Sequence, residues 1–344
     1  MWVSTAPYDR GYFLLNVGLL TSLRCFLISN PFSEFNLMRP YSFSRVLVFV
    51  FLALLFAPAF SYAAPTERTV LLIAGPPSHG PGEHEHNAGV LLFQKCLAGF
   101  AGLNVKISLN GWPRDPATFD HVDAIVFYSD GGGKHLALID DHLAFLRPLI
   151  AHDVGLGLIH YAIEPTLAKG QAEFLQWVGG CFEINWSVNP LWEADFKHLP
   201  QHPITRGVRP FHLADEWYYH LRFNEDPKGL TPLLVNVPPP SSLSRPDGAH
   251  EGNPAVRTAI ARGESQTLAW AYERADGGRG FGFSGGHYHR NWANDDVRKF
   301  VLNAIVWLAK GEVPETGVSS TLTPEDLTQN LDPKPKKPAP SPAR

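Results

Sequence analysis

The sequence predicts an α/β domain built on a mainly parallel sheet. Three short apolar runs, at residues 70–74, 123–128 and 155–159, have the length and continuity of strands that are covered on both faces. Apolar residues recur at helical spacing in the segments that follow these runs. Strands that alternate with helices favour parallel pairing, because each helix carries the chain back to the starting edge of the sheet.

The first half of the domain follows this alternation closely. The strand expected between the first two apolar runs is recognised by its alternating apolar and polar residues. In chain order, the expected strands are 70–74, 105–109, 123–128 and 155–159, and the expected helices are 88–97 and 138–151.

The second half is less regular. Residues 181–240 are rich in Trp, Pro and His and predict a layer of loops and short strands. Residues 267–274 and 279–284 read as a β-hairpin, because Asp-Gly-Gly stands between them. An amphipathic helix over about residues 295–309 is expected to close the domain.

The N-terminal region has the pattern of a secretory signal peptide. A short basic segment, residues 38–45, precedes an apolar run over 46–56, and Ser61 and Ala63 supply the small residues of a cleavage site. We therefore expect translation to start at Met38 and the protein to be exported to the periplasm or the medium. The alternative is an uncleaved N-terminal anchor.

Three segments follow from these features. Residues 1–63 are an extension plus signal peptide, residues 66–318 form one α/β domain, and residues 319–344 are a Pro- and Lys-rich tail. The tail lacks the apolar residues that a core needs, so we expect it to be disordered, with one short helix at most from Thr323.

Composition narrows the class of ligand. The net charge is −4 and aromatic residues make up 12% of the chain, nine of them Trp. No basic surface for nucleic acid is indicated, whereas an aromatic-rich cleft suits a small carbohydrate. Export would leave Cys96 and Cys181, which are too few for a disulfide framework and are expected to be buried free thiols.

Residues 78–87 carry the densest group of titratable side chains. Three His and two Glu fall within eight positions, directly after the first expected strand. The carboxyl end of a parallel strand is where a ligand-binding loop is expected, so this stretch is placed at the mouth of a cleft. The alternative is a solvated polar loop. The loop at 129–135 can let backbone N–H groups approach a ligand, and His160 stands at the turn after the fourth strand.

Several separated motifs occur together, in a fixed order, over residues 70–314. Together they resemble the ThuA-like (trehalose utilisation) family. The matching pieces are the loop His79 to His86, Gly157-Leu158-Ile159-His160, His202-Pro203-Ile204-Thr205, Asp215-Glu216-Trp217-Tyr218, Ala269-Trp270, Gly285-Gly286-His287-Tyr288-His289 and Asn294-Asp295-Asp296.

The resemblance implies a flavodoxin-like three-layer fold of the class I glutamine amidotransferase type, and a role in the metabolism of trehalose or of oxidised (keto) glycosides. True amidotransferases carry a nucleophilic Cys at the turn where this sequence has His160. Because Cys96 lies within a helix and Cys181 follows the next helix, neither replaces it. Glutamine hydrolysis through a thioester is therefore not expected.

The residues favour acid/base chemistry on a sugar. An imidazole titrates near neutral pH, which suits His160 or His84 as base or acid, with Asp215 or Glu216 as a proton-donating or orienting carboxylate. For Asp215 the alternative is a structural buried hydrogen bond, and for the aromatic residues it is core packing. The expected substrate-binding residues are His79, Glu83, His86, Asn87, Tyr161, Trp217, Tyr218, His287, Tyr288, His289, Asn291 and Trp292, of which Trp217, Tyr218, Tyr288 and Trp292 would form a stacking platform.

No metal is assigned from the sequence, because no H-E-x-x-H or comparable spacing is present. If a divalent metal binds, the expected ligands are His84, His86, His287 and His289, since residues two apart share a face of an extended strand. The first hypothesis is an exported lyase or hydrolase that acts on a keto glycoside or disaccharide. The alternatives are a non-catalytic sugar-binding module and a metal-dependent hydrolase.

Overall fold

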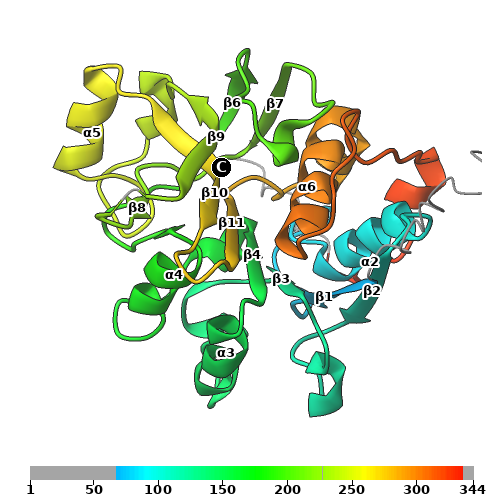
Figure 1. Cartoon of the computed structure of the whole chain (residues 1–344). Helices are drawn as coiled ribbons and strands as arrows, with labels where there is room; N and C mark the ends of the chain where they lie inside the picture. The colour runs from blue at the N-terminus through cyan, green and yellow to red at the C-terminus, as the bar shows by residue number, and fades with distance from the viewer. Residues whose placement is uncertain (1–66, 227, 336–344) are drawn as a thin grey trace, which may run out of the picture. The chain divides into compact units, whose positions relative to one another are not determined.

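The computed structural model describes residues 67–226 and 228–335 (Figure 1). The predicted signal peptide and the expected start at Met38 lie outside these residues and stay predictions. Within the described part of the chain, none of the helices combines the length and the apolar character that a membrane crossing needs.

A seven-stranded sheet organises the domain, with the order β2-β1-β3-β4-β11-β10-β9. The first five strands in this order pair in parallel, and β10 and β9 pair antiparallel at one edge. This confirms the predicted fold class and the hairpin between β10 and β11. The strands are β1 (Arg68–Ala74), β2 (Leu103–Ser108), β3 (Ala124–Tyr128), β4 (Gly155–Ile159), β9 (Leu230–Asn236), β10 (Gln266–Glu273) and β11 (Arg279–Phe283).

Helices cover both faces of this sheet, which gives three layers (Figure 1). Along β1, Val70 and Leu72 are buried in one apolar cluster with α2 (His86–Leu97) and α6 (Asp295–Leu308). The alternate residues Leu71 and Ile73 are buried in a second cluster with α3 (His142–Ala151) and α4 (Gln171–Trp177). Successive side chains of a strand point to opposite faces, so a strand covered on both faces must be apolar throughout.

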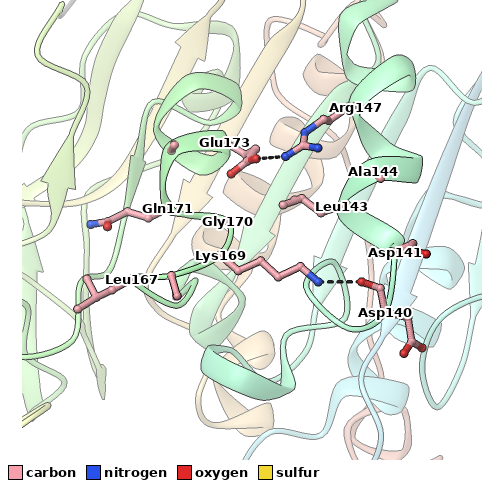
Figure 2. Close-up of a pocket in the computed structure, with 12 residues that line it drawn as sticks. Asp140, Asp141, Leu143, Ala144, Arg147, Leu167, Lys169, Gly170, Gln171 and Glu173 are labelled. Atoms are coloured by element: carbon pink, nitrogen blue, oxygen red, sulfur yellow. Dashed lines mark hydrogen bonds and ion pairs between the residues drawn. The ribbon is translucent and has the colours of Figure 1, made fainter.

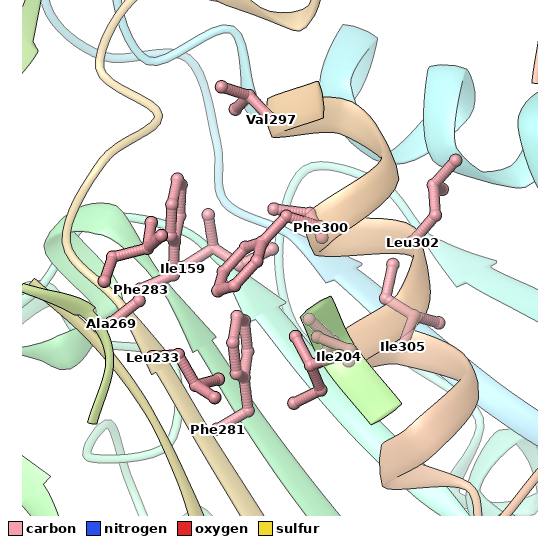
Figure 3. Close-up of a cluster of buried hydrophobic side chains, with 14 of the residues drawn as sticks. Ile159, Ile204, Leu233, Ala269, Phe281, Phe283, Val297, Phe300, Leu302 and Ile305 are labelled. Carbon is pink, nitrogen blue, oxygen red and sulfur yellow. The ribbon is translucent and has the colours of Figure 1, made fainter. Parts of the chain in front are cut away.

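The core under α6 anchors the end of β11. Phe281 and Phe283 on β11 lie 5.8 and 5.9 Å, between ring centroids, from Phe300 on α6 (Figure 3). All three rings are almost fully buried, and full burial of one such side chain stabilises the fold by about 1.5–3 kcal/mol. Asn294 is the N-cap of α6, and its side chain accepts hydrogen bonds from the N–H groups of Asp296 and Val297. This packing fixes the end of β11, where the loop to α6 begins.

The irregular second half contains the short strands that were expected. They are β5 (Gly180–Cys181) paired with β8 (Arg222–Phe223), and β6 (Leu191–Phe196) paired antiparallel with β7 (Phe211–Glu216); α5 (Pro254–Ala261) follows β9. Short 3-10 helices lie in the connections: η1 (Pro116–Phe119), η2 (Gly132–Lys134), η3 (His160–Ile163), η4 (Pro203–Thr205), η5 (Pro240–Leu243), η6 (His289–Ala293) and η7 (Pro324–Leu327). Cys181 is buried, Cys96 is half-buried, and both are free.

Residues 319–335 have a defined path, where the sequence predicted a disordered tail. Leu322 and Leu327 pack against the apolar core, and the Lys95 ammonium on α2 contacts the carboxylate of Asp326. The side chain of Lys334 is buried. Leu322, Leu327, Asp326 and Lys334 thus have partners on the rest of the domain, which composition alone does not reveal.

His135 should make the stability of the fold depend on pH. It is fully buried, its Nδ1 accepts the N–H of Ala137 (3.0 Å) and its Nε2 donates to the Ala162 carbonyl (2.8 Å), so the ring must be neutral. Burial lowers the pKa of His135 to about 4. Because the unfolded state takes up the proton first, near pH 6.5, the free energy of unfolding should fall by roughly 3 kcal/mol between pH 6.5 and 4.

Urea unfolding at pH 7, 5.5 and 4 measures this loss. The matched variant His135→Gln keeps an acceptor and a donor but does not titrate, so its stability should fall less over the same range. An equal fall in both proteins would contradict the assignment to His135.

Candidate metal centre

The candidate site lies at the carboxyl ends of four strands that are neighbours in the sheet. The chain that leaves β1 supplies His84, the end of β3 supplies Asp130, and the chain beyond β4 and β11 supplies His160 and His287. The chain passes from β1 to β2, which lies on one side of β1 in the sheet, and then to β3, which lies on the other side of β1. Ligands of open α/β sheets bind at such a switch point.

Three imidazoles converge there. The Nε2 atoms of His84 and His160 are 3.1 Å apart, and the Nδ1 atom of His287 lies 3.1 Å from His84 Nε2 and 3.3 Å from His160 Nε2. The three side chains come from sequence positions up to 203 residues apart, and all of them are buried.

Two of these rings carry their proton on the nitrogen that faces away from the centre. Nδ1 of His84 lies 3.0 Å from the carboxylate of Asp130, and Nδ1 of His160 lies 2.8 Å from the Ser284 carbonyl. Both oxygens only accept, so both Nδ1 atoms carry hydrogen and both Nε2 atoms present a lone pair. On the third ring, Nε2 of His287 faces the carboxylate of Glu83 at 3.9 Å, which leaves Nδ1 toward the centre. In the neutral rings, the Nε2 lone pairs of His84 and His160 therefore face each other with no proton between them, and Nδ1 of His287 lies 3.1 and 3.3 Å from these two atoms.

Glu216 and Tyr218 complete the cluster. The Glu216 Oε2 atom is 3.4 Å from His287 Nδ1 and 3.6 Å from His160 Nε2. The Tyr218 hydroxyl lies 3.2 Å from His160 Nε2 and donates to Glu216 Oε2 at 3.2 Å. Burial and the neighbouring carboxylates raise the pKa of Tyr218 well above its usual range, so the phenol stays protonated.

The imidazoles are kept in their neutral form. Burial lowers the pKa of His84 and His160 well below the usual value, and the positive charge that neighbouring rings would carry lowers both further. Neutral imidazole is the form that binds a metal ion, and a cluster of unprotonated nitrogens is what such an ion requires.

The backbone is strained at this site. His79, His84 and His160 have φ angles of 58°, 45° and 58°, in the left-handed region that non-glycine residues seldom adopt. Such residues cost of order 1–3 kcal/mol each and persist where their surroundings over-determine them, commonly at functional sites. The N–H of His84 donates to the His287 carbonyl at 2.9 Å, which ties two of the converging residues together.

Asp215 does not face the centre, although it was a candidate acid or base. Its carboxylate accepts the N–H groups of Glu216 (2.8 Å), Gly286 (2.9 Å) and His287 (3.1 Å), and the side-chain amide of Asn291 (3.0 Å). Burial raises the pKa of Asp215, and these donors oppose that effect. The structure thus makes Asp215 a buried hydrogen-bond acceptor, which was the alternative, and one of its donors is the N–H of His287.

Several other predicted residues form the rim. His79 and Glu83 are partly exposed, with the His79 ring stacked on that of His84 at 3.5 Å between centroids. Tyr161 and Tyr288 are half-buried, and the Arg290 guanidinium lies 3.9 Å from the centroid of the Tyr288 ring. This rim is where the cluster meets solvent.

The remaining predicted residues lie away from the centre. Trp217 and Trp292 are completely buried in the apolar core. The prediction that these two rings form part of a stacking platform for a sugar is therefore wrong. His86 turns its Nδ1 toward the Pro76 carbonyl (3.3 Å), and the Asn87 amide donates to the side chain of Asn110 (3.0 Å). His289 is buried and, among the described residues, neither of its ring nitrogens has a hydrogen-bond partner.

Sequence reasoning missed Asp130 and the pair Glu164–His250. Asp130 was part of a loop expected to offer only backbone N–H groups, yet its position directly after a buried strand is the feature that marks a site residue. The Glu164 carboxylate lies 3.0 Å from His250 Nε2, beside the rim residue Tyr161. No local pattern predicts this pair, because 86 positions separate the two residues.

A separate pocket lies between α3 and the segment that leads into α4 (Figure 2). Lys169 donates to the Asp140 carbonyl at 2.7 Å, and Arg147 pairs with Glu173 at 2.5 Å. It contains none of the converging imidazoles, and its two cations, Arg147 and Lys169, already have partners. It is therefore not the candidate site.

Comparisons with known proteins place the chain in a family. Residues 70–308 match the family described as ThuA, trehalose utilisation. The solved structure of a ThuA-like protein from Bacteroides uniformis aligns with a TM-score of 0.50 at 15% identity, over 73% of this chain and 94% of that one. One from Parabacteroides merdae aligns with a TM-score of 0.47 at 14% identity, over 76% and 99%. The search of curated proteins gave no match. Since the family match spans more than half of its residues, the chain belongs to the ThuA (trehalose utilisation) family.

Proposed function

We propose that this protein is a metal-dependent enzyme that acts on a sugar, with His84, His160, His287 and Glu216 as the ligands of one divalent ion. The observation that carries the proposal is the convergence of three imidazole nitrogens, two of which belong to rings whose proton is held on the opposite nitrogen. Lone pairs this close repel one another, and a cation between them removes that repulsion.

The spacing of the nitrogens supports this reading. Zinc–nitrogen bonds of about 2.0–2.1 Å place two ligand atoms roughly 2.9–3.4 Å apart, for ligand angles between octahedral and tetrahedral. The three N–N distances here are 3.1, 3.1 and 3.3 Å. Imidazole with one carboxylate suits zinc and other first-row divalent ions rather than calcium or magnesium.

The residues beside the ligands suit acid/base work on a glycoside. The family suggests a sugar ligand, and the rim offers the polar side chains of His79 and Glu83 with the rings of Tyr161 and Tyr288. When bound, the ion would polarise a sugar oxygen. Tyr218, protonated and in contact with Glu216, would deliver or accept a proton beside it. We propose lyase or hydrolase action on a keto glycoside or disaccharide.

Metal analysis and a substrate panel test the proposal together. The purified chain should bind about one zinc, manganese, cobalt or nickel ion tightly, and chelation should abolish product formation from one member of a panel of disaccharides and 3-keto glycosides. Substoichiometric metal in active protein would overturn the metal centre. Sugar binding without product, with metal bound, would instead make the chain a sugar-binding module.

A further inference from the structure

The C-terminal segment is bound to the loop that supplies His84. Lys334 and Glu85 face each other with side chains only 2% and 1% exposed, and the Lys334 Nζ atom lies 3.3 Å from Glu85 Oε1. The same ammonium donates to the His84 carbonyl at 3.1 Å and to the Glu83 carbonyl. Two residues earlier in the chain, the Asp332 N–H donates to Glu85 Oε2 at 2.7 Å.

These contacts use the full capacity of the ammonium. A lysine has three N–H donors, and three oxygens of one short loop surround it. Within the described residues, Lys334 is the cation that pairs with Glu85, whose other oxygen partners are backbone N–H groups of Gly82 and Asp332. A buried carboxylate without a cation is costly, so the loop depends on the tail for its charge balance.

The loop that Lys334 contacts includes the strained residue His84. His84 has a φ angle of 45°, its N–H is fixed by the His287 carbonyl, and its own carbonyl is fixed by Lys334. The backbone is thus held on both sides of the strained residue. Small rotations here would swing the imidazole away from the other two rings, because the ring extends several ångströms from the backbone.

We infer that Lys334 is a positioning residue for the metal centre, a charge brought in by the tail that keeps His84 in its ligating conformation. The inference rests on the proposed function. A second attachment holds the same tail about eight residues earlier, where Lys95 contacts Asp326 on the surface of α2. That contact does not touch the loop, so it provides a matched control.

The test uses Co²⁺, whose visible absorption reports the geometry of its ligands. Lys334→Met should weaken Co²⁺ binding by roughly 10–100-fold and change the spectrum, because supporting groups around ligands typically have effects of this size. Added ammonium ion should partly restore binding by entering the vacated position. Lys95→Met should leave both affinity and spectrum unchanged.

A double variant, Lys334→Met with Glu85→Gln, guards against a loss of folding. It removes the unpaired buried carboxylate, so thermal stability should return toward that of the original protein, while Co²⁺ affinity stays low because the carbonyls of Glu83 and His84 have lost their donor. Failure of the unaltered protein to bind Co²⁺ would overturn the proposed metal centre. Normal binding by the unaltered protein and by both Lys334 variants would overturn the role of Lys334 alone.

Discussion

Replacement of His160 by alanine is expected to remove the bound divalent metal and to abolish turnover, while the chain remains folded. His160 Nε2 lies 3.1 Å from His84 Nε2 and 3.3 Å from His287 Nδ1, at the middle of the converging atoms. Loss of a direct ligand should lower metal affinity by more than about 100-fold, since outer partners alone are worth roughly 10–100-fold. Elemental analysis after dialysis and product formation from an accepted sugar measure the two effects.

The controls separate loss of a ligand from loss of structure. His160→Asn keeps a residue type that tolerates the left-handed conformation at φ 58°, so it should fold at least as well as the alanine variant and still lose the metal. His289→Leu removes another buried imidazole whose nitrogens have no partners among the described residues, and it should retain the metal. Full metal content in either His160 variant would contradict the site.

The pairs His84/His86 and His287/His289 show why only two of the four ligands expected from the sequence reach the centre. Residues two apart share a face only if the chain is extended, and that condition fails in both pairs. His84 is in the left-handed region and His86 begins α2. After Gly286, with a φ angle of 106°, the chain enters η6 at His289. Each pair is therefore split, and one imidazole of each faces the centre.

The first half of the fold was predictable because its strands are covered on both faces. β3 and β4 are buried at every position, so their sequences are unbroken apolar runs whose limits the structure reproduces to within one residue. Their carboxyl ends then follow from parallel pairing. This is why His160, directly after β4, could be named as a candidate site residue from the sequence.

Contacts between distant segments were not predictable. Glu216 reaches the centre because β7 ends there after pairing with β6, and neither strand has the long apolar run of the central sheet. The adjacent Trp217 looks like a sugar platform in sequence, but its Nε1 donates to the Leu213 carbonyl and its ring packs against Phe283. Local composition does not distinguish a core tryptophan from one that lines a cleft.

Asp215 is expected to affect stability and metal binding together. In Asp215→Asn, one carboxylate oxygen becomes an NH₂ group that must face N–H donors, either those of Glu216 and His287 or those of Gly286 and Asn291. Because a buried donor left without an acceptor costs about 1–3 kcal/mol, and charged acceptors are worth more, the free energy of unfolding should fall by roughly 2–4 kcal/mol. Urea unfolding of the metal-free protein measures this loss.

The same substitution should also lower metal affinity, because Asp215 holds the backbone of His287. With its N–H no longer held by Asp215, the loop after β11 can shift, and metal affinity should fall by roughly 10–100-fold although no ligand has been removed. Asp195→Asn makes the same chemical change on the paired strand β6, where the side chain is 52% exposed, and should change stability by less than about 0.5 kcal/mol. If Asp215→Asn lowered stability but left metal affinity intact, Asp215 would support the fold without positioning His287. A fall in both quantities, absent from the control, would show that the hydrogen bonds from the end of β7 set the geometry of the centre.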